Sequence, residues 1–385
     1  MISVPRQACL ESSGSPHPCS RHAPVVALHA VLIPFASMTS PPRCLFLARV
    51  AHVDLLESVE FYREDLATLD QLGYEVQIAI RNRDAIRARR PALVYCWWQH
   101  SALLTIIAWR LRGVPVVVTG ALHFKDPGHR SARGRVRKLA SCIGAAMATL
   151  NIAISQVEEH DLRFLPRTRR VEVPLGVDTQ YYTGAGRQGP PSAVTIGQLN
   201  PVSIHRKGID VVIAAVPLIA RDLPDFHLHV VGLVTPEGER MVRDMVAAGD
   251  PERTTVHGAV SRARKLEILR ASDLYLQAST FEGFGLSALE ALSCGVPVIH
   301  SGRGSLPEVV GDAGISVPDR TPEAFAAAIV SYYSEPSARA TLPVRARQQA
   351  ESLSRDARTD RLSAVLAEVT RRSRRPGRPT SRVAR

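Results

Sequence analysis

Lysine is scarce in this sequence of 385 residues, and its scarcity affects how the positive charge is interpreted. Among the 48 basic residues only four are lysines, at positions 125, 138, 207 and 265. We interpret this skew as codon bias and not as a surface built to bind nucleic acid, although the formal net charge is +12. No motif of a nucleic-acid-binding fold is visible, so nucleic acid is not an expected partner.

Cysteine is also rare, and its spacing fits neither a disulfide framework nor a zinc site. The six cysteines form no C-x-x-C pair, and none has a histidine at zinc-finger spacing. Their density is too low for a domain that depends on disulfides. We therefore expect a reducing, cytoplasmic compartment in which most of the thiols fill the core.

A long apolar run is missing as well. No run reaches the ~18 residues of a transmembrane helix, and the nearest one, residues 23–36, contains two prolines and a histidine. This run could belong to a signal peptide. We favour the alternative that residues 1–37 are a disordered or mis-called extension and that Met38 is the true start, because a strand pattern begins abruptly at 44–50.

The C-terminal end is basic and almost without apolar residues. Seven arginines and no acidic residue fall in the last 15 positions, which leaves a net charge of +5 for the rest of the chain. Residues 373–385 cannot bury enough surface to fold and are expected to be disordered. They are either a solvated tail or a weak contact for anionic lipid, worth about 1 kcal/mol per basic residue near the surface.

Between these ends, short apolar runs alternate with amphipathic stretches. Near-continuous apolar strands separated by helices indicate parallel sheets covered on both faces. We expect two doubly wound domains with a cleft between them. The expected strands are 44–50, 75–80, 92–96, 114–118, 151–155, 170–173, 193–197, 227–231, 254–257, 273–277, 296–299 and 314–317. The expected helices are 55–72, 206–220, 236–248, 262–271, 285–294, 321–334, 337–353 and 357–372.

The domain boundaries follow from one break in this alternation. Residues 183–192 hold three glycines and two prolines, which is typical of a linker. We expect a first domain over 38–182 and a second over 193–353. A helix over 354–372 should pack back on the first domain, before the basic tail.

The segment 279–299, STFEGFGLSALEALSCGVPVI, carries the most chemical information. A strand runs into a glycine loop, and a helix should begin near Gly285. Glycines let backbone amides approach a ligand, and a helix N-terminus attracts an anion such as phosphate. Glu282 precedes this helix and Glu290 lies within it, eight positions later. Gly283-x-Gly-x-x-Ala288 also fits a relaxed dinucleotide fingerprint, but that fingerprint needs an acid about 20 residues later, where an arginine stands.

This segment resembles the signature of retaining nucleotide-sugar glycosyltransferases of the GT-B fold, in particular family 4 (group 1). The resemblance extends through most of residues 44–370. Four further segments resemble parts of that family: VPLGVD at 173–178, IGQL at 196–199, HRKGID at 205–210 and SLPEVVGDAG at 305–314. It implies a GT-B architecture, in which two Rossmann-like domains face an interdomain cleft.

The resemblance also implies roles for individual residues in the second domain. Glu290 would bind the ribose hydroxyls and Glu282 would lie near the donor sugar. Lys207 would neutralise the diphosphate. The remaining donor-binding residues would be the loop and helix start at Gly283, Phe284, Gly285 and Leu286.

Each of these residues also has a plainer explanation. Glu282 could be a structural acid at a helix N-terminus, Glu290 part of a solvated helix face, and Lys207 a solvated charge at a helix end. One position departs from the family, because Gln198 stands where arginine is common. A lost charge-assisted hydrogen bond of roughly 1.5–3 kcal/mol would weaken donor binding about tenfold or more. Arg206 is our candidate to replace it.

The first domain gives weaker indications. His52 follows the first strand and could contact the acceptor or cap the next helix. His123 is the candidate for a histidine that family members place near the donor sugar. Trp98, with its neighbour Trp97, could stack on a sugar ring or fill a helix–sheet seam.

The resemblance therefore implies an enzyme that transfers a hexose, such as mannose or glucose, from a nucleoside diphosphate sugar to a hydroxyl with retention. The acceptor would be a glycan, a lipid-linked sugar or a small molecule, as in polysaccharide biosynthesis. No D-x-D pair is present to carry a metal ion, so neither metal nor cofactor is expected. The alternatives are an inactive GT-B scaffold and another GT-B enzyme, such as an epimerase. Location would be cytoplasmic or peripheral on the inner membrane face.

Overall fold

The computed structural model describes residues 41–120, 132–165, 168–184, 187 and 189–374. Expectations for the N-terminal extension, for His123 and for positions 375–385 lie outside these residues. Contacts divide the chain into two compact units. Of the described residues, the first unit holds those up to 154, 159–173 and those from 359 on, and the second holds 155–158 and 174–358.

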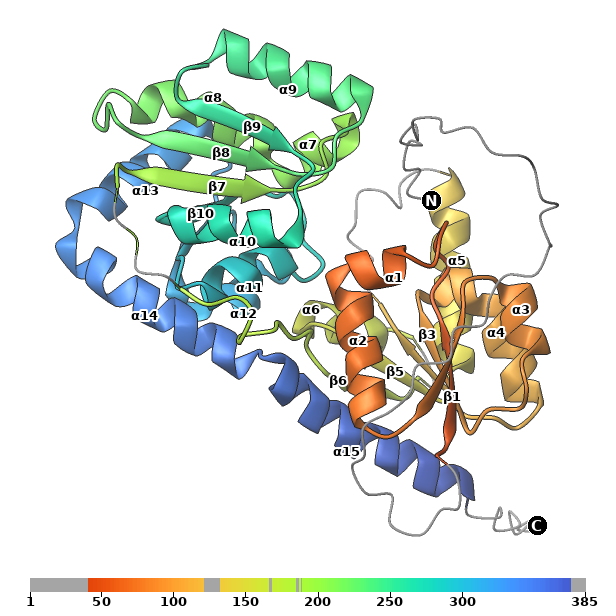
Figure 1. Cartoon of the computed structure of the whole chain (residues 1–385). Coiled ribbons are helices and arrows are strands. Elements are labelled where there is room, and N and C mark those ends of the chain that lie inside the picture. The colour runs from red at the N-terminus through yellow and green to blue at the C-terminus, as the bar shows by residue number, and fades with distance from the viewer. Residues whose placement is uncertain (1–40, 121–131, 166–167, 185–186, 188, 375–385) are drawn as a thin grey trace, which may run out of the picture. The chain divides into compact units, whose positions relative to one another are not determined.

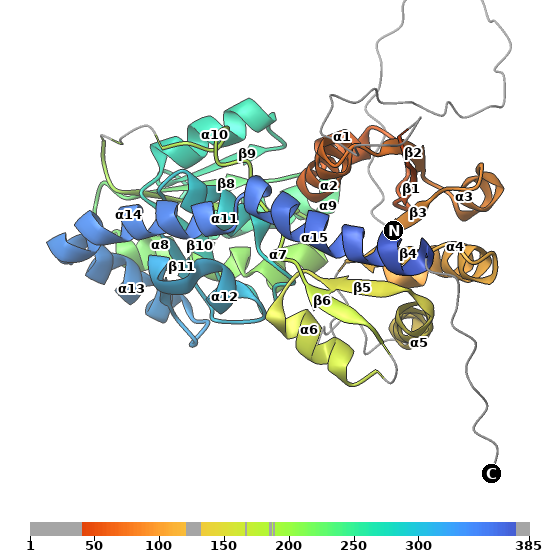
Figure 2. The ribbon, with the colours of Figure 1, turned by 90° about the horizontal axis from the view of Figure 1, so that it is seen from below.

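The first unit is built on a six-stranded parallel sheet in the order β2-β1-β3-β4-β5-β6. Its central strands are buried because their apolar runs lie between two helix layers. Helices α3 (Asn82–Arg87), α4 (Gln99–Leu111) and α5 (Ala132–Met147) cover one face, and α2 (Glu60–Gln71) and α15 (Arg355–Arg374) the other (Figures 1 and 2). The strands are β1 (Arg43–Leu47), β2 (Glu75–Ala79), β3 (Leu93–Trp97), β4 (Val116–Thr119), β5 (Leu150–Ala153) and β6 (Arg170–Glu172).

The helices of the first unit differ from expectation in two respects. One is that α3, α4, α5 and α6 (Gln156–Arg163) were not among the expected helices. The other is that the expected helix 55–72 is interrupted at Val59, whose backbone is extended. The last helix contacts this unit through Thr359, 3.2 Å from Thr68, and through Glu368, 3.9 Å from Arg169. The helices are α1 (Leu55–Ser58), α2 (Glu60–Gln71), α3 (Asn82–Arg87), α4 (Gln99–Leu111), α5 (Ala132–Met147), α6 (Gln156–Arg163) and α15 (Arg355–Arg374).

The second unit repeats this plan with the strand order β12-β11-β10-β7-β8-β9, again all parallel. The order reverses between β7 and β10, which is the switch point where open α/β sheets bind ligands beyond the carboxyl ends of their strands. The strands are β7 (Ser192–Ile196), β8 (His227–Val231), β9 (Thr254–Gly258), β10 (Leu274–Gln277), β11 (Val298–His300) and β12 (Gly314–Ser316).

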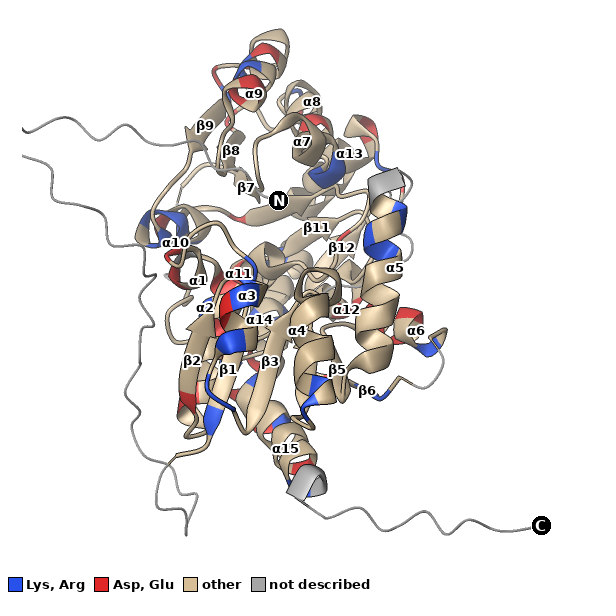
Figure 3. Cartoon of the chain, turned by 90° about the vertical axis from the view of Figure 1, so that its right-hand side faces the viewer, with Lys and Arg blue, Asp and Glu red and all other residues tan. Residues whose placement is uncertain are grey.

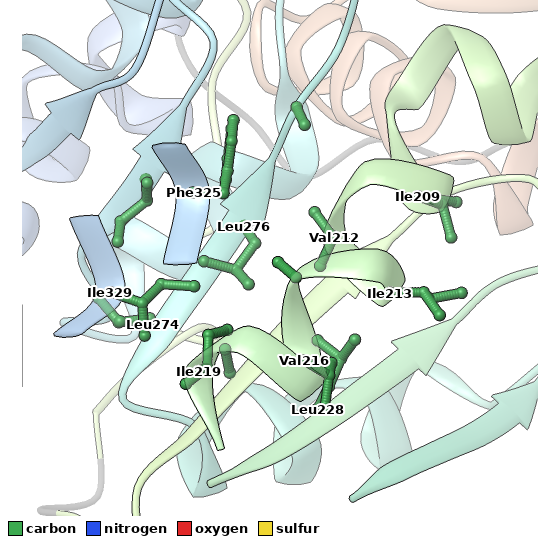
Figure 4. Close-up of a cluster of buried hydrophobic side chains, with 14 of the residues drawn as sticks. Ile209, Val212, Ile213, Val216, Ile219, Leu228, Leu274, Leu276, Phe325 and Ile329 are labelled. Atoms are coloured by element: carbon green, nitrogen blue, oxygen red, sulfur yellow. The ribbon is translucent and has the colours of Figure 1, made fainter. Parts of the chain in front are cut away.

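The core of the second unit forms around α8. Its buried residues recur at helical spacing and pack on β8, β10 and α13 (Figure 4). The helices are α7 (Pro201–Lys207), α8 (Ile209–Ile219), α9 (Pro236–Ala248), α10 (Arg262–Ala271), α11 (Leu286–Ser293), α12 (Leu306–Val310), α13 (Pro322–Ser334) and α14 (Pro336–Ser352).

The expected single helix over 206–220 is wrong. A first helix begins at Pro201, with the Asn200 side chain accepting from the amide of Ser203 at its N-cap, and ends at Lys207. Gly208 then adopts a left-handed conformation with φ of 69°, and α8 starts at Ile209. Lys207 therefore lies at a helix C-terminus and not at the beginning of a helix.

No helix in the described ranges is long and apolar enough to cross a bilayer. Of the six cysteines, Cys44, Cys96 and Cys294 are buried, Cys142 is half-buried, and all four are thiols.

Candidate active site

The glycine loop lies between β10 and α11, at the carboxyl end of β10. Gly285, with φ of 104°, occupies the N-cap, and the helix runs from Leu286 to Ser293, close to the expected 285–294. The N-cap contributes no side-chain hydrogen bond to the first turn. The amides of that turn are thus the backbone groups that a bound anion would approach.

Neighbouring residues fix the shape of this loop. The Ser305 hydroxyl donates to the carbonyl oxygens of Glu282 and Phe284, at 3.1 and 3.0 Å. At Gly304 an added Cβ would lie 2.1 Å from the Glu282 carbonyl oxygen, so the two backbones touch. Phe284 is buried, whereas Gly283 and Leu286 are half-buried. The SLPEV segment thus acts as a support for the glutamate loop.

Glu282 is a buried, ionised carboxylate. Its Oε2 atom pairs with the Lys207 ammonium and accepts a hydrogen bond from Gln277 Nε2 at 2.5 Å. Burial alone would raise the pKa of Glu282, but Lys207, Arg206 and the Gly283 amide together hold that pKa below its ordinary value. The Glu282 side chain is 10% exposed, so it lies close to the surface.

A close backbone contact positions Lys207 beside the Glu282 carboxylate. At Gly208 an added Cβ would lie 2.0 Å from the Ala278 carbonyl oxygen, so only glycine lets the α7–α8 junction touch the end of β10. The neighbouring Thr280 amide donates to the Arg206 carbonyl oxygen at 2.8 Å. In the HRKG segment the glycine therefore allows the close backbone contact, and this contact places the preceding lysine beside Glu282.

Gln198 lies at the end of the neighbouring strand, β7. Its Oε1 atom is 3.5 Å from Asn200 Nδ2, and the side chain is half-buried. Arg206 is close enough to Glu282 to lower its pKa, which places a second cation beside Lys207. Among the described residues, no group of three or more His, Cys, Asp or Glu side chains is arranged to hold a metal ion.

Glu290 is even more buried than Glu282, with 2% exposure. Its Oε1 atom accepts hydrogen bonds from Tyr182 Oη at 2.9 Å and from Lys265 Nζ at 2.6 Å. The suggestion that Glu290 is part of a solvated helix face is therefore wrong. The same holds for Lys207 as a solvated helix-end charge, because its side chain is 17% exposed and ion-paired.

Two of the candidates in the first unit, His52 and Trp98, lie among the described residues. His52 is exposed, and its carbonyl oxygen accepts from the Leu55 amide at 3.3 Å. Trp98 is half-buried and donates its indole N–H to Tyr62 Oη at 2.9 Å. It has an unusual φ of 66° for a residue with a side chain. His123 lies outside the described residues.

Sequence reasoning did not identify Lys265, Tyr182 or Gln277. For Lys265 a signal was present, because it is one of only four lysines in the sequence. Tyr182 was expected to be the last residue of the first domain. Contacts instead place residues 174–358 in the second unit, which therefore includes Tyr182. Gln277 ends a strand at the switch point, which is a position from which side chains reach the ligand.

A family model described as glycosyl transferases group 1 matches residues 190–335. Among curated proteins, the chain is 35% identical over 168 residues to the D-inositol 3-phosphate glycosyltransferase of Rhodococcus jostii, covering 41% of this chain and 36% of that protein. It is 43% identical over 84 residues to the O-antigen chain mannosyltransferase B of Escherichia coli, covering 22% of each. The match thus spans about a third of the length of the first of these relatives.

Two solved structures show the likeness of fold. Sucrose-phosphate synthase from Thermosynechococcus elongatus superposes with a TM-score of 0.64 at 20% identity, covering 84% of this chain and 81% of that one. HepE from Anabaena, in complex with UDP and glucose, superposes with a TM-score of 0.67 at 18% identity, covering 85% and 99%. Both are GT-B glycosyltransferases. The chain accordingly has the two-domain GT-B fold, and its residues 190–335 match the family model of group 1 glycosyl transferases.

Proposed function

We propose that this protein is a retaining glycosyltransferase that moves a hexose from a nucleoside diphosphate sugar to a hydroxyl acceptor without a metal ion. The observation that carries this proposal is the arrangement of the two motif glutamates. Glu282 lies in the loop after β10 and Glu290 in the helix that follows this loop; both are buried, and each is paired with a lysine. Curated relatives named as glycosyltransferases and neighbours solved with UDP or UDP-glucose support the same substrate class.

In the proposed reaction the bond between the anomeric carbon and the diphosphate oxygen breaks, and the acceptor oxygen bonds to the same face of that carbon. The acceptor proton goes to the departing diphosphate, whose negative charge grows as the bond breaks. Lys207 and the amides at the start of α11 would stabilise this charge, since prearranged cations and helix ends act most strongly where charge develops. Glu282 would face the positive charge that develops on the sugar as this bond breaks. Glu290 would accept hydrogen bonds from the ribose hydroxyls.

The proposal is tested by the release of a nucleoside diphosphate. A thermal-shift screen against UDP-, GDP-, ADP- and TDP-sugars selects the donor, and slow hydrolysis of that donor is then followed. We expect Glu282→Gln to lose turnover while keeping donor affinity, and Glu290→Gln to lose affinity. Donor binding without release in the unmutated protein would favour the inactive scaffold, and full activity of both variants would refute the site.

For the acceptor we propose a glycan or lipid-linked sugar at a membrane surface. Helix α5, along which Figure 3 marks basic positions, supports this, because Val136 and Leu139 are 69% and 61% exposed and the neighbouring Arg135 and Arg137 are exposed as well. Neither α4 nor α5 contains an acidic residue. A basic helix with exposed apolar side chains is suited to an anionic bilayer surface.

The membrane proposal is tested by co-sedimentation with vesicles. Vesicles of phosphatidylcholine containing phosphatidylglycerol should retain the protein, and pure phosphatidylcholine should not. We expect Val136→Ser combined with Leu139→Ser to reduce binding several-fold, and removal of residues 375–385 to reduce it through charge alone. Equal binding to both vesicle types, or none to either, would contradict the proposal.

A further inference from the structure

Each motif glutamate has a lysine of its own. Lys207 pairs with Glu282, and Lys265 pairs with Glu290. Two of the four lysines in a chain with 48 basic residues thus contact the two acids of one short motif. A lysine ammonium is a compact point charge on a flexible stem, whereas an arginine presents a broad planar fork. Lysine is therefore better suited than arginine to reach a single oxygen of a nearly buried carboxylate.

The Glu290 carboxylate is held from two directions. Tyr182 Oη, from the segment before the linker, and Lys265 Nζ, from α10, both donate to the Oε1 atom of Glu290, at 2.9 and 2.6 Å. The lysine ammonium also lies 5.3 Å from the centre of the Tyr182 ring, so the two donors support each other. Three separate segments of the second unit thus meet at one carboxylate oxygen.

This arrangement has a physical consequence for ligand binding. A glutamate on a helix keeps several rotatable bonds, and ordering them when a ligand arrives reduces affinity. A carboxylate that is 2% exposed also needs a cation to offset its lost hydration. Donors that fix its position before the ligand arrives remove the ordering cost and leave the charge in place.

We propose that Lys265 and Tyr182 are positioning residues that hold the Glu290 carboxylate ready for the ribose hydroxyls of the donor. The inference rests on the proposed function and deepens it, because it assigns the recognition of the ribose to a three-residue unit. Lys265 and Tyr182 act through Glu290 and belong to the binding of the nucleoside, not to the chemical step. Their loss should therefore raise the donor KM and leave kcat within a few-fold.

The experiment compares a nucleoside diphosphate with its 2′,3′-dideoxy counterpart by titration calorimetry. The probe is UDP, GDP or ADP, whichever the unmutated protein binds. We expect the unmutated protein to prefer the ribose form about tenfold, since a hydrogen bond to a charged group contributes that much. In Lys265→Met this preference should fall to nearly one, while affinity for the dideoxy form changes little.

Matched variants separate positioning from stability. Arg264→Met removes a cation from the same helix, where Arg264 pairs with the exposed Glu267, and should keep the preference for ribose. Lys265→Arg keeps the charge but presents the broader planar fork, and it should therefore recover the preference only in part. Tyr182→Phe keeps the ring, removes only the hydroxyl and should halve the preference or more. It also keeps the inference testable if Lys265→Met fails to fold.

The outcomes distinguish this inference from the proposed function. If the unmutated protein binds none of these three diphosphates and does not bind TDP either, the proposed function fails and the positioning role fails with it. If it binds TDP alone, which lacks the 2′-hydroxyl, only the positioning role is overturned. If it binds one of them and folded Lys265→Met and Tyr182→Phe both keep the full preference for ribose, the positioning role alone is overturned. Equal weakening of both ligand forms would likewise overturn it, because that result indicates a general structural effect.

Discussion

Glu282 and Glu290 are both buried and both paired with lysine, but different parts of the fold hold them. Glu282 lies on a loop, and its lysine reaches it because Gly208 lets the α7–α8 junction touch the end of β10. Glu290 lies inside α11, and its partners come from α10 and from the segment before the linker. The first pair therefore depends on one close backbone contact, and the second depends on the packing of side chains between helices.

The largest expected effect comes from breaking the first pair. Lys207→Met removes the cation at the diphosphate and leaves a buried carboxylate without its ammonium partner. We expect turnover to fall by about 100- to 1000-fold, as for other lost groups that stabilise developing charge. The measurement is the rate of donor hydrolysis at saturating donor. Turnover within tenfold of the unmutated protein would show that Arg206 alone can serve, and would contradict the assigned role.

The next effect tests the backbone contact behind that pair. Gly208→Ala combines a left-handed φ of 69° with a Cβ that would lie 2.0 Å from a carbonyl oxygen. We expect a loss of about 3 kcal/mol in the free energy of unfolding, from strain and overpacking together. Gly258→Ala is the matched control, because φ is 65° there but nothing lies within 4 Å of the added Cβ. Urea unfolding should show a clearly larger loss for Gly208→Ala.

A third test measures how the free energy of unfolding depends on pH, through the buried His300 beside the Glu282 region. His300 pairs in the sheet with Gln277, the residue that donates to Glu282. Burial lowers the pKa of His300 from 6.5 to about 4. The unfolded chain therefore binds a proton more readily, so this stability is complete above about pH 6.5 and is lost as the pH falls toward 4. From about pH 7.5 to about pH 5 the loss should be about 2 kcal/mol.

The check on this prediction is urea unfolding at both pH values. His300→Gln should be less sensitive to acid over that range than the unmutated protein. The Glu282 pair responds at lower pH, because its depressed pKa gives stability that is present above 4.5 and is lost as the pH falls below that value. An equal acid response of His300→Gln and the unmutated protein would contradict the assignment.

The smallest expected effect concerns the second pair. Glu290→Gln keeps the shape of the side chain and removes the charge that would accept the ribose hydroxyls. We expect the donor KM to rise about tenfold, which corresponds to about 1.4 kcal/mol, with kcat nearly unchanged. Steady-state kinetics measure both constants. A fall in kcat without a change in KM would mean that the two glutamates have the opposite roles.

Much of the fold was predictable, because strands in a parallel sheet are short apolar runs with clear ends. The expected runs at 227–231 and 273–277 lie within one residue of β8 and β10. The expected helix over 206–220 failed because His205-Arg-Lys-Gly also suits a helix that ends at a left-handed glycine. Local sequence does not distinguish a helix start from a helix end when cations and a glycine stand together.

Sequence by itself determined the two doubly wound sheets and the loop and helix that carry Glu282 and Glu290. Those features follow from apolar periodicity and from glycine and glutamate spacing, which are local properties of the chain. Only the tertiary structure decided that Lys207 pairs with Glu282 and Lys265 with Glu290. It also decided that Tyr182 donates a second hydrogen bond to Glu290. The reason is that Lys265 and Tyr182 are separated from Glu290 by 25 and 108 positions, and only the packing of the fold brings such residues together.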